Sequence, residues 1–219
     1  MPALPFEDRF EAGRLLGGEL ASRKMGADPI LIALPRGGVP VGASAAEALG
    51  APLDIVVARK LGVPWRPELA MGAIAGEARV LDSALIRQLG ITAREIDAVA
   101  VREMQELARR EALYRNGRPG PLFRGRTVVL VDDGVATGST AAAAARHIRR
   151  FHPKRLIVAA PVASAQAARR LKAEADECVW LAVPEPFLAV GEWYADFRQI
   201  TDDEVRALLQ ESRRSVSRK

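Results

Sequence analysis

The feature that most constrains this chain is the alternation of short apolar runs with segments of helical periodicity. The runs are rich in β-branched residues, and most are followed by a stretch whose apolar residues recur every three to four positions. Strands that alternate with helices form a parallel sheet covered on both faces. We therefore predict an α/β protein with a doubly wound parallel sheet. Its strands are expected at residues 30–34, 53–58, 127–131, 155–160 and 178–183.

Helices are expected between these strands, at residues 6–25, 40–49, 83–89, 92–114, 139–150 and 164–174, with a last one starting near residue 202. Thr92 and Glu95 have the spacing of a capping box. Residues 59–82 are interrupted by glycines and prolines, so that only short strands near 70–75 and 78–81 are expected there. A length of 219 residues favours one domain with an appendage.

Three segments are placed where ligands usually bind. Ligands of open parallel sheets lie beyond the carboxyl ends of the strands. Three segments that follow predicted strands contain glycines or charged residues that could bind a ligand. They are residues 35–38, 59–60 and 132–140.

The third of these segments carries the strongest signal. The apolar run 128–131 ends in Asp132 and Asp133, and a short loop leads to Thr137-Gly138-Ser139-Thr140 at the start of a helix. Free N–H groups at a helix start bind phosphate, and a glycine lets its oxygens approach the chain. The adjacent carboxylates suit sugar hydroxyls or a metal ion. Walker and dinucleotide-binding patterns are excluded, because the lysine of the former and the glycine spacing of the latter are missing.

Residues 128–140 resemble the binding motif of the type I phosphoribosyltransferases: four apolar residues, two acids, three spacer residues and Thr-Gly-x-Thr. The resemblance implies that Asp132 and Asp133 hold the ribose hydroxyls of phosphoribosyl pyrophosphate (PRPP). The 5-phosphate would lie on Ala136, Thr137, Gly138, Ser139 and Thr140. It also implies Mg²⁺ as cofactor, held by Asp132 and Asp133 directly or through PRPP and water. The expected activity is transfer of the phosphoribosyl group to a nitrogenous base with release of pyrophosphate.

The two other segments fit the same family in the same order. Arg36, Gly37 and Gly38 match its pyrophosphate loop, and the Pro35–Arg36 peptide bond is expected to be cis. Arg59 and Lys60 match the basic residues after the second strand, near the pyrophosphate. The resemblance thus assigns catalysis to Asp132, Asp133, Lys60 and Arg36.

A basic stretch precedes the motif. Residues 109–126 contain six arginines and one acid, and the glycines and prolines at 117–121 predict a mobile loop. Residues 114–124 lie where the family places a flexible catalytic loop. We expect them to close over pyrophosphate, with Arg115 and Arg118 contacting it.

The acceptor base is expected under a small hood. The whole chain, residues 1–219, is predicted to be one domain with a core at about 30–183, a hood at about 184–200 plus the N-terminal segment, and a basic tail at 212–219. Aromatic residues, which can stack on a base, are concentrated between 180 and 197. Residues 187–191 resemble the base-stacking segment of purine-type members of the family, and this resemblance makes Phe187 the candidate for stacking on the base. Ala136 replaces the aspartate of hypoxanthine-guanine-type members, so the acceptor stays open.

The composition of the chain limits its expected cellular location and partners. A single cysteine, Cys178, allows no internal disulfide, and the first residues form no signal peptide, so a cytoplasmic protein without membrane spans is expected. The net charge is +5, of which the tail 212–219 supplies most, so nucleic acid is not an expected partner. A homodimer is expected. Two alternatives remain: a regulatory protein of the same fold that senses PRPP or a nucleotide, and a receiver-like signalling domain.

Overall fold

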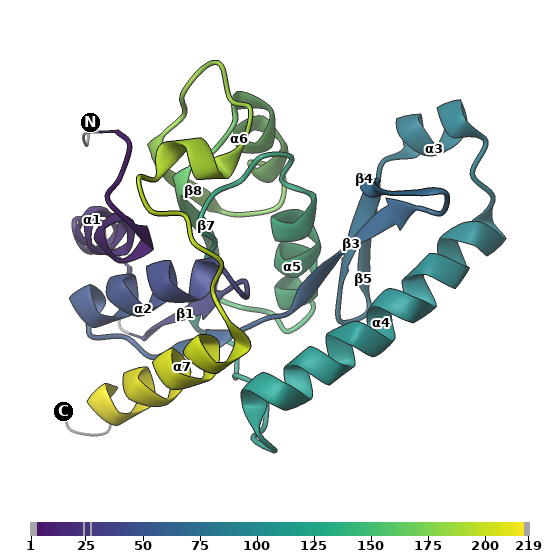
Figure 1. Cartoon of the computed structure of the whole chain (residues 1–219). Coiled ribbons are helices and arrows are strands. Elements are labelled where there is room, and N and C mark those ends of the chain that lie inside the picture. Colours follow the sequence, from purple (N-terminus) through teal and green to yellow (C-terminus); the bar gives the residue numbers. More distant parts are fainter. Residues whose placement is uncertain (1–3, 24, 27, 217–219) are drawn as a thin grey trace.

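The centre of the molecule is a parallel sheet of five strands, in a computed structural model that describes residues 4–23, 25–26 and 28–216 (Figure 1). All neighbouring pairs run parallel. The predicted α/β class and parallel sheet are therefore confirmed. The strands, in the spatial order β2-β1-β6-β7-β8, are β2 (Leu53–Ile55), β1 (Pro29–Ala33), β6 (Thr127–Val131), β7 (Arg155–Val162) and β8 (Glu177–Ala182).

Helices cover both faces of this sheet because successive residues of a buried strand point to opposite sides. In β6, Val129 and Val131 share a core with residues of α1 (Arg9–Ala21), α2 (Gly38–Leu49) and α7 (Asp202–Val216). Val128 and Leu130 share the other core with α5 (Ser139–Arg149) and α6 (Ala165–Leu171). Every residue of β6 is buried, as expected for a strand between two helical layers.

A second sheet, which the sequence did not predict as a unit, packs on the outer side of α5. It is antiparallel and contains β3 (Ala58–Val63), β4 (Arg66–Ala75) and β5 (Ala78–Leu81). The predicted strand 53–58 was too long, because β2 ends at Ile55 and the chain enters the second sheet at Ala58. The short strands predicted near 70–75 and 78–81 are confirmed as parts of β4 and β5.

The run Ala141–Ala145 explains how the two sheets are joined. All five alanines are buried, and α5 contacts the parallel sheet on one side and β3, β4 and β5 on the other. A helix enclosed in this way needs small side chains all around its axis. The alanine run therefore brings the antiparallel sheet close to the parallel one.

Two helices follow the second sheet, α3 (Ser83–Leu89) and α4 (Ala93–Arg115). The predicted capping box of Thr92 and Glu95 is present at the start of α4. The predicted helix 92–114 is confirmed, whereas the interpretation of residues 109–126 as a loop was wrong for their first part, because α4 ends only at Arg115, with Asn116 as its C-cap. Glu106 of α4 pairs with Arg109 and Arg110, which lets these arginines remain helical.

Residues 183–201 connect β8 to α7 and contain one short 3₁₀ helix, η1 (Val190–Trp193). They lie beside the N-terminal segment: the Phe6 N–H donates to the Trp193 carbonyl at 2.9 Å, and the Ala195 N–H donates to the Phe6 carbonyl at 2.7 Å. Of the predicted basic tail, residues 212–216 belong to α7 and residues 217–219 lie outside the described part. None of the described helices combines the length and apolar character needed to cross a membrane.

Candidate functional site

The carboxyl ends of β1 and β6 meet at the centre of the parallel sheet. From β1 the chain passes through α2 to β2 on one side, and from β6 it passes through α5 to β7 on the other. A crevice opens where successive connections diverge in this way, and ligands of such sheets bind there. The loops on its two sides are residues 34–38 and 132–138, which are two of the three segments singled out in the sequence.

Two glycines bring these loops into direct contact. A Cβ atom at Gly37 would lie 1.9 Å from Oδ2 of Asp133, and one at Gly38 would lie 2.8 Å from the Val131 carbonyl oxygen. A larger residue at either position would therefore push the loops apart. The Pro35–Arg36 peptide bond is cis, as predicted from the sequence.

The two acids at the end of β6 have different surroundings. Oδ1 of Asp132 accepts the Asp133 N–H at 2.9 Å, and Oδ2 of Asp133 accepts Nε of Arg9 at 2.8 Å. Burial, followed by the neighbouring carboxylate, raises the pKa of Asp132 well above its ordinary value, while Lys60 acts in the opposite direction. Burial also raises the pKa of Asp133, against the opposing effect of Arg9. Of the two acids, Asp133 is thus the one with a cation as a direct partner among the described residues.

The start of α5 forms a cradle for an anion. Gly138 adopts a left-handed conformation with φ 76°, and the helix begins at Ser139. The first N–H groups of a helix have no partner within it and favour negative charge. Arg170 of α6 adds a cation that the sequence analysis missed: its Nη1 donates to Oγ of Ser139 at 3.0 Å. No local pattern points to Arg170, because it is 31 residues away in the chain.

A pocket of about 280 Å³ joins these parts. Lys60 of β3 lines it together with the acids, the cradle and, from the hood, Val190 and Phe197. The structure thus brings together seven of the predicted site residues, Lys60, Asp132, Asp133, Ala136, Thr137, Gly138 and Thr140.

A second pocket of about 440 Å³ shares Lys60 and Thr140 with the first. It lies between α4 and the antiparallel sheet and reaches Pro35 of the first loop. Basic side chains of β3 and α4 dominate its charged lining, which consists of Arg59, Lys60, Arg102, Glu103 and Arg110. Negative ligand groups are favoured on this side of the site.

A family model for the phosphoribosyl transferase domain matches residues 65–187. This chain belongs to the phosphoribosyl transferase family. The match covers more than half of the 219 residues and includes the acid pair and the cradle at the start of α5. The family resemblance predicted from residues 128–140 is therefore confirmed.

Relatives of known sequence and structure agree with this membership. Two proteins of Mycobacterium tuberculosis, Rv0571c of strain H37Rv and MT0597 of strain CDC 1551, carry phosphoribosyl transferase as a provisional name. Each is 44% identical over 213 residues, which are 97% of this chain but 48% of the relative. This chain thus spans about half the length of these curated relatives. The crystal structure of TT1426 from Thermus thermophilus is similar over 95% of this chain and 99% of that one, with 44% identity and a TM-score of 0.80.

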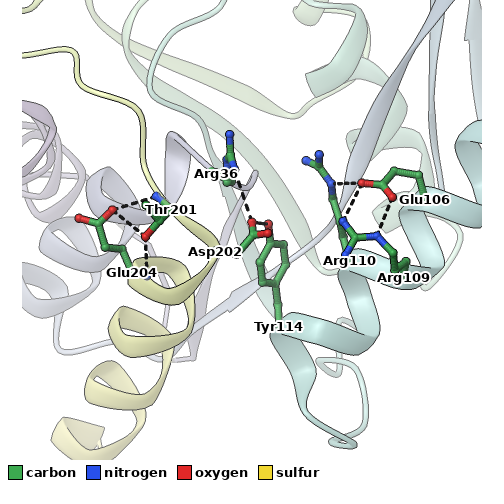
Figure 2. Close-up of polar contacts among 8 residues, drawn as sticks. All are labelled: Arg36, Glu106, Arg109, Arg110, Tyr114, Thr201, Asp202 and Glu204. Carbon is green, nitrogen blue, oxygen red and sulfur yellow. Dashed lines mark hydrogen bonds and ion pairs between the residues drawn. The ribbon is translucent and has the colours of Figure 1, made fainter.

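Arg36, which the family resemblance places near pyrophosphate, points elsewhere in this structure. Its Nη1 lies 3.7 Å from Oδ1 of Asp202, and the same oxygen accepts the Tyr114 hydroxyl at 2.6 Å. Figure 2 shows the two side chains converging on Asp202, at the start of α7. Burial, and then the bond to Asp202, raises the pKa of Tyr114. An anionic ligand that engages the Arg36 side chain must therefore draw it away from Asp202.

Two further predicted residues lie away from the first pocket. Nε of Arg59 donates to Glu103 of α4 at 2.8 Å, so Lys60 is the basic residue of this pair that faces the acids. Phe187 packs on Trp193, with ring centroids 6.1 Å apart, and does not line the pocket. Phe197 is the hood aromatic residue that lines this pocket. The concentration of aromatic residues at 180–197 was the signal, but it did not single out one ring.

The predicted lid, residues 114–124, lines neither pocket. Tyr114 and Arg115 end α4, and Phe123 is buried in the core on the α5 side. Arg115 donates to Oδ1 of Asp54 at 3.2 Å and to the Ile55 carbonyl at 2.9 Å. The expectation that Arg115 belongs to a mobile loop was therefore wrong, because it ends α4 and two acceptors of β2 hold its guanidinium.

The fit of Mg²⁺ can be judged from the available oxygen ligands. No group of three or more metal-binding side chains occurs among the described residues. The acid pair offers two carboxylates, and Oδ2 of Asp133 is engaged by Arg9. Proteins often bind Mg²⁺ through one or two carboxylates, with substrate phosphates and waters as the other ligands. The acid pair fits an ion shared with a phosphorylated substrate.

Proposed function

We propose that this protein is a Mg²⁺-dependent phosphoribosyltransferase that moves the 5-phosphoribosyl group of PRPP to a nitrogenous base. The observation that carries the proposal is the pocket in which Lys60, the acid pair and the start of α5 face one another. These groups match the three parts of PRPP: a phosphate, a sugar with vicinal hydroxyls and a diphosphate. Membership of the phosphoribosyl transferase family supports the same function.

Each part of the substrate has a place in this arrangement. The 5-phosphate lies on the first N–H groups of α5, where the helix dipole and Arg170 favour a dianion. The ribose hydroxyls donate to Asp132 and Asp133. Pyrophosphate lies along the Gly37–Gly38 backbone and Lys60, with the basic pocket beyond it.

The reaction replaces one bond at C1 of the ribose. The C1–O bond breaks and its electron pair leaves with pyrophosphate, while the lone pair of a ring nitrogen forms the new C1–N bond. Any proton on that nitrogen passes to pyrophosphate or solvent. Positive charge grows on the ribose and negative charge on the leaving group, so Lys60 and the backbone N–H groups of the first loop stabilise the transition state. Groups preorganised in this way commonly contribute about 10²–10³ in rate.

Asp132 and Asp133 would hold Mg²⁺ together with PRPP. When bound, the ion supplies positive charge that offsets the charge developing on pyrophosphate. The carboxylates also orient the ribose, which keeps C1 between the acceptor and the leaving group.

The acceptor is a planar nitrogen heterocycle on the hood side. Phe197 and Val190 form the apolar border of the first pocket there. Stacking of a base on an aromatic side chain is worth about 1–3 kcal/mol. A cytoplasmic location and a homodimer complete the proposal as predictions from the sequence.

The test is an incubation of the protein with PRPP, Mg²⁺ and a panel of purines, pyrimidines and other nitrogen heterocycles, with pyrophosphate release as the readout. At least one base should give release that is absent from Asp132→Asn. Binding of PRPP without release with any base would instead establish the regulatory alternative. Failure of PRPP to bind would exclude both.

A further inference from the structure

Arg9 is the least exposed charged residue among the described residues, at 7% exposure. Burying a charge is costly unless it is paired and hydrogen-bonded. Here Nε donates to Oδ2 of Asp133 at 2.8 Å, and Nη1 donates to the Arg198 carbonyl at 2.9 Å. Both polar contacts are made on the site side of the helix that begins with Arg9.

The guanidinium also lies on an aromatic ring of the hood. Its central carbon is 3.8 Å from the ring centroid of Phe197 and 5.8 Å from that of Tyr194. The Tyr194 hydroxyl donates to the Asp133 carbonyl, and the two rings lie 5.3 Å apart. Arg9 therefore touches the ribose-side acid and the ring that borders the acceptor side at the same time.

The backbone around Arg9 is fixed from both directions. Asp8 caps α1 by accepting the Glu11 N–H at 2.8 Å, and Phe6 exchanges hydrogen bonds with residues 193 and 195. The N-terminal segment and the hood thus run side by side before α1 begins (Figure 1). Arg9 does not line either pocket, so its effect on a ligand must pass through Asp133 and Phe197.

We propose that Arg9 is a positioning residue that holds the Asp133 carboxylate and the Phe197 ring in a fixed relation, so that PRPP and the acceptor meet in one geometry. The proposal rests on the proposed function, because it assigns Asp133 to the ribose. The contact at Oδ2, together with the close approach of Gly37 to the same oxygen, fixes the rotation of the carboxylate. A planar guanidinium can donate in two fixed directions and also pack on an aromatic ring, and the ammonium group of lysine does not replace both contacts.

The test compares two ligands that use different parts of the site. PRPP contains the ribose that faces Asp133, whereas inorganic pyrophosphate occupies only the Lys60 and Gly37 side. Arg9→Lys keeps the charge but loses the fork of donors and the close contact of the guanidinium with the Phe197 ring. We expect it to weaken PRPP binding about tenfold and to change pyrophosphate binding less than twofold, both measured by calorimetry in Mg²⁺.

Arg14→Lys is the matched control, since Arg14 lies on the same helix and is exposed. It should change neither affinity. Phe197→Leu is the second variant: its side chain is 38% exposed, so folding should tolerate the change, and loss of the ring should weaken PRPP binding several-fold through Arg9.

The outcomes separate this inference from the function on which it rests. Selective loss of PRPP affinity in Arg9→Lys or Phe197→Leu supports it. Unchanged PRPP affinity in these variants, or an equal loss of affinity for PRPP and pyrophosphate, overturns the positioning role of Arg9. The proposed function then still stands, provided that the wild type binds PRPP. Absence of PRPP binding by the wild type overturns both.

Discussion

Gly37 lies directly against the carboxylate of Asp133, so that a Cβ atom there would be 1.9 Å from Oδ2. Gly37→Ala must therefore displace the acid, the loop or both. We expect the variant to fold but to lose most of the thermal stabilisation that PRPP and Mg²⁺ give the wild type, measured by differential scanning fluorimetry.

Gly18→Ala is the control for this substitution. Gly18 lies within α1, and a Cβ atom there meets nothing within 4 Å. Replacing such a glycine by alanine stabilises a protein by about 0.4–1 kcal/mol. It should leave the PRPP effect unchanged. Equal PRPP effects in Gly37→Ala and Gly18→Ala would show that the first loop does not contact the ligand.

Replacing Asp132 or Asp133 by asparagine should change the stability of the free protein in different ways. Asp132→Asn removes one of two neighbouring buried carboxylates, so the free protein should stay as stable or become more stable. Asp133→Asn leaves the buried Arg9 without its counter-charge, which costs up to about 3–5 kcal/mol. Urea denaturation of both variants measures this difference.

Both amide variants should also lose PRPP binding. At about 100 times its dissociation constant, PRPP should stabilise the wild type by about 2.7 kcal/mol. That gain should disappear in Asp132→Asn despite its intact fold. Retention of the full gain would mean that Asp132 is not a ribose ligand.

Alkali should destabilise the protein through Tyr114. Burial and the bond to Asp202 raise the pKa of this phenol in the folded state. Above an unfolded pKa of about 10, the unfolded chain loses a proton that the folded protein retains, so stability falls as pH rises. Each such group contributes a slope of about 1.4 kcal/mol per pH unit.

Tyr114→Phe should remove the contribution of one such group to the slope of stability against pH. Tyr194, the other tyrosine, has a pKa raised mainly by burial, and its share should remain. Denaturation midpoints at several values above about pH 10 give the comparison. An unchanged slope in Tyr114→Phe would contradict the raised pKa of Tyr114 in the folded protein.

Mild acid should destabilise the protein through His147. Its Nδ1 is buried without a hydrogen-bond partner in the described structure, and burial lowers the pKa of the ring. Below an unfolded pKa of about 6.5, the unfolded chain takes up a proton before the folded protein does, so stability is lost as pH falls. The midpoint of urea denaturation should therefore decrease between about pH 7.5 and 5.5, and less so in His147→Gln.

His152→Asn provides the control for that experiment. His152 is the only other histidine, it is exposed, and asparagine tolerates its φ of 52°. Its substitution should leave the dependence on pH in place. If the dependence of stability on pH were lost in His152→Asn rather than in His147→Gln, its assignment to His147 would be refuted.

Arg115→Ala should affect stability rather than turnover. The side chain is 14% exposed and is held by Asp54 and the Ile55 carbonyl, so its loss should cost about 1.5–3 kcal/mol. Arg118 is exposed, and its replacement by alanine should change stability by less than about 0.5 kcal/mol. Reduced turnover with wild-type stability in either variant would instead support the predicted lid of residues 114–124.

The sequence predicted the parallel sheet because its signals are local. A strand such as β6 is buried on both faces and is a continuous apolar run in the sequence, and the acids and glycine after it are adjacent in the chain. The antiparallel sheet escaped prediction because Pro64, Pro67 and several glycines obscure the hairpin of β3 and β4. Gly62 is needed there for close packing, since a Cβ atom at this position would lie 2.4 Å from the Pro67 carbonyl.

The site, like the fold, was predictable only where its residues lie in local sequence patterns. Asp132 follows β6, and Lys60 lies in β3, which begins shortly after β2 ends, so the order of the strands along the chain indicates both. Arg9, Arg170 and Phe197 enter the site through contacts between residues distant in sequence, and such contacts leave no periodic pattern. Phe187 was chosen by resemblance, but Trp193 provides it with an apolar partner away from the pocket.

The distance along the chain between Arg9 and its partners has a consequence for biosynthesis. Asp133 follows it by 124 residues and Arg198 by 189. During translation, a nascent chain that has formed β1, β6 and α5 still lacks the carbonyl and the ring that complete the surroundings of Arg9. The surroundings of Arg9 are therefore complete only after the hood has been synthesised, later than the strands β1 and β6 that meet at the site.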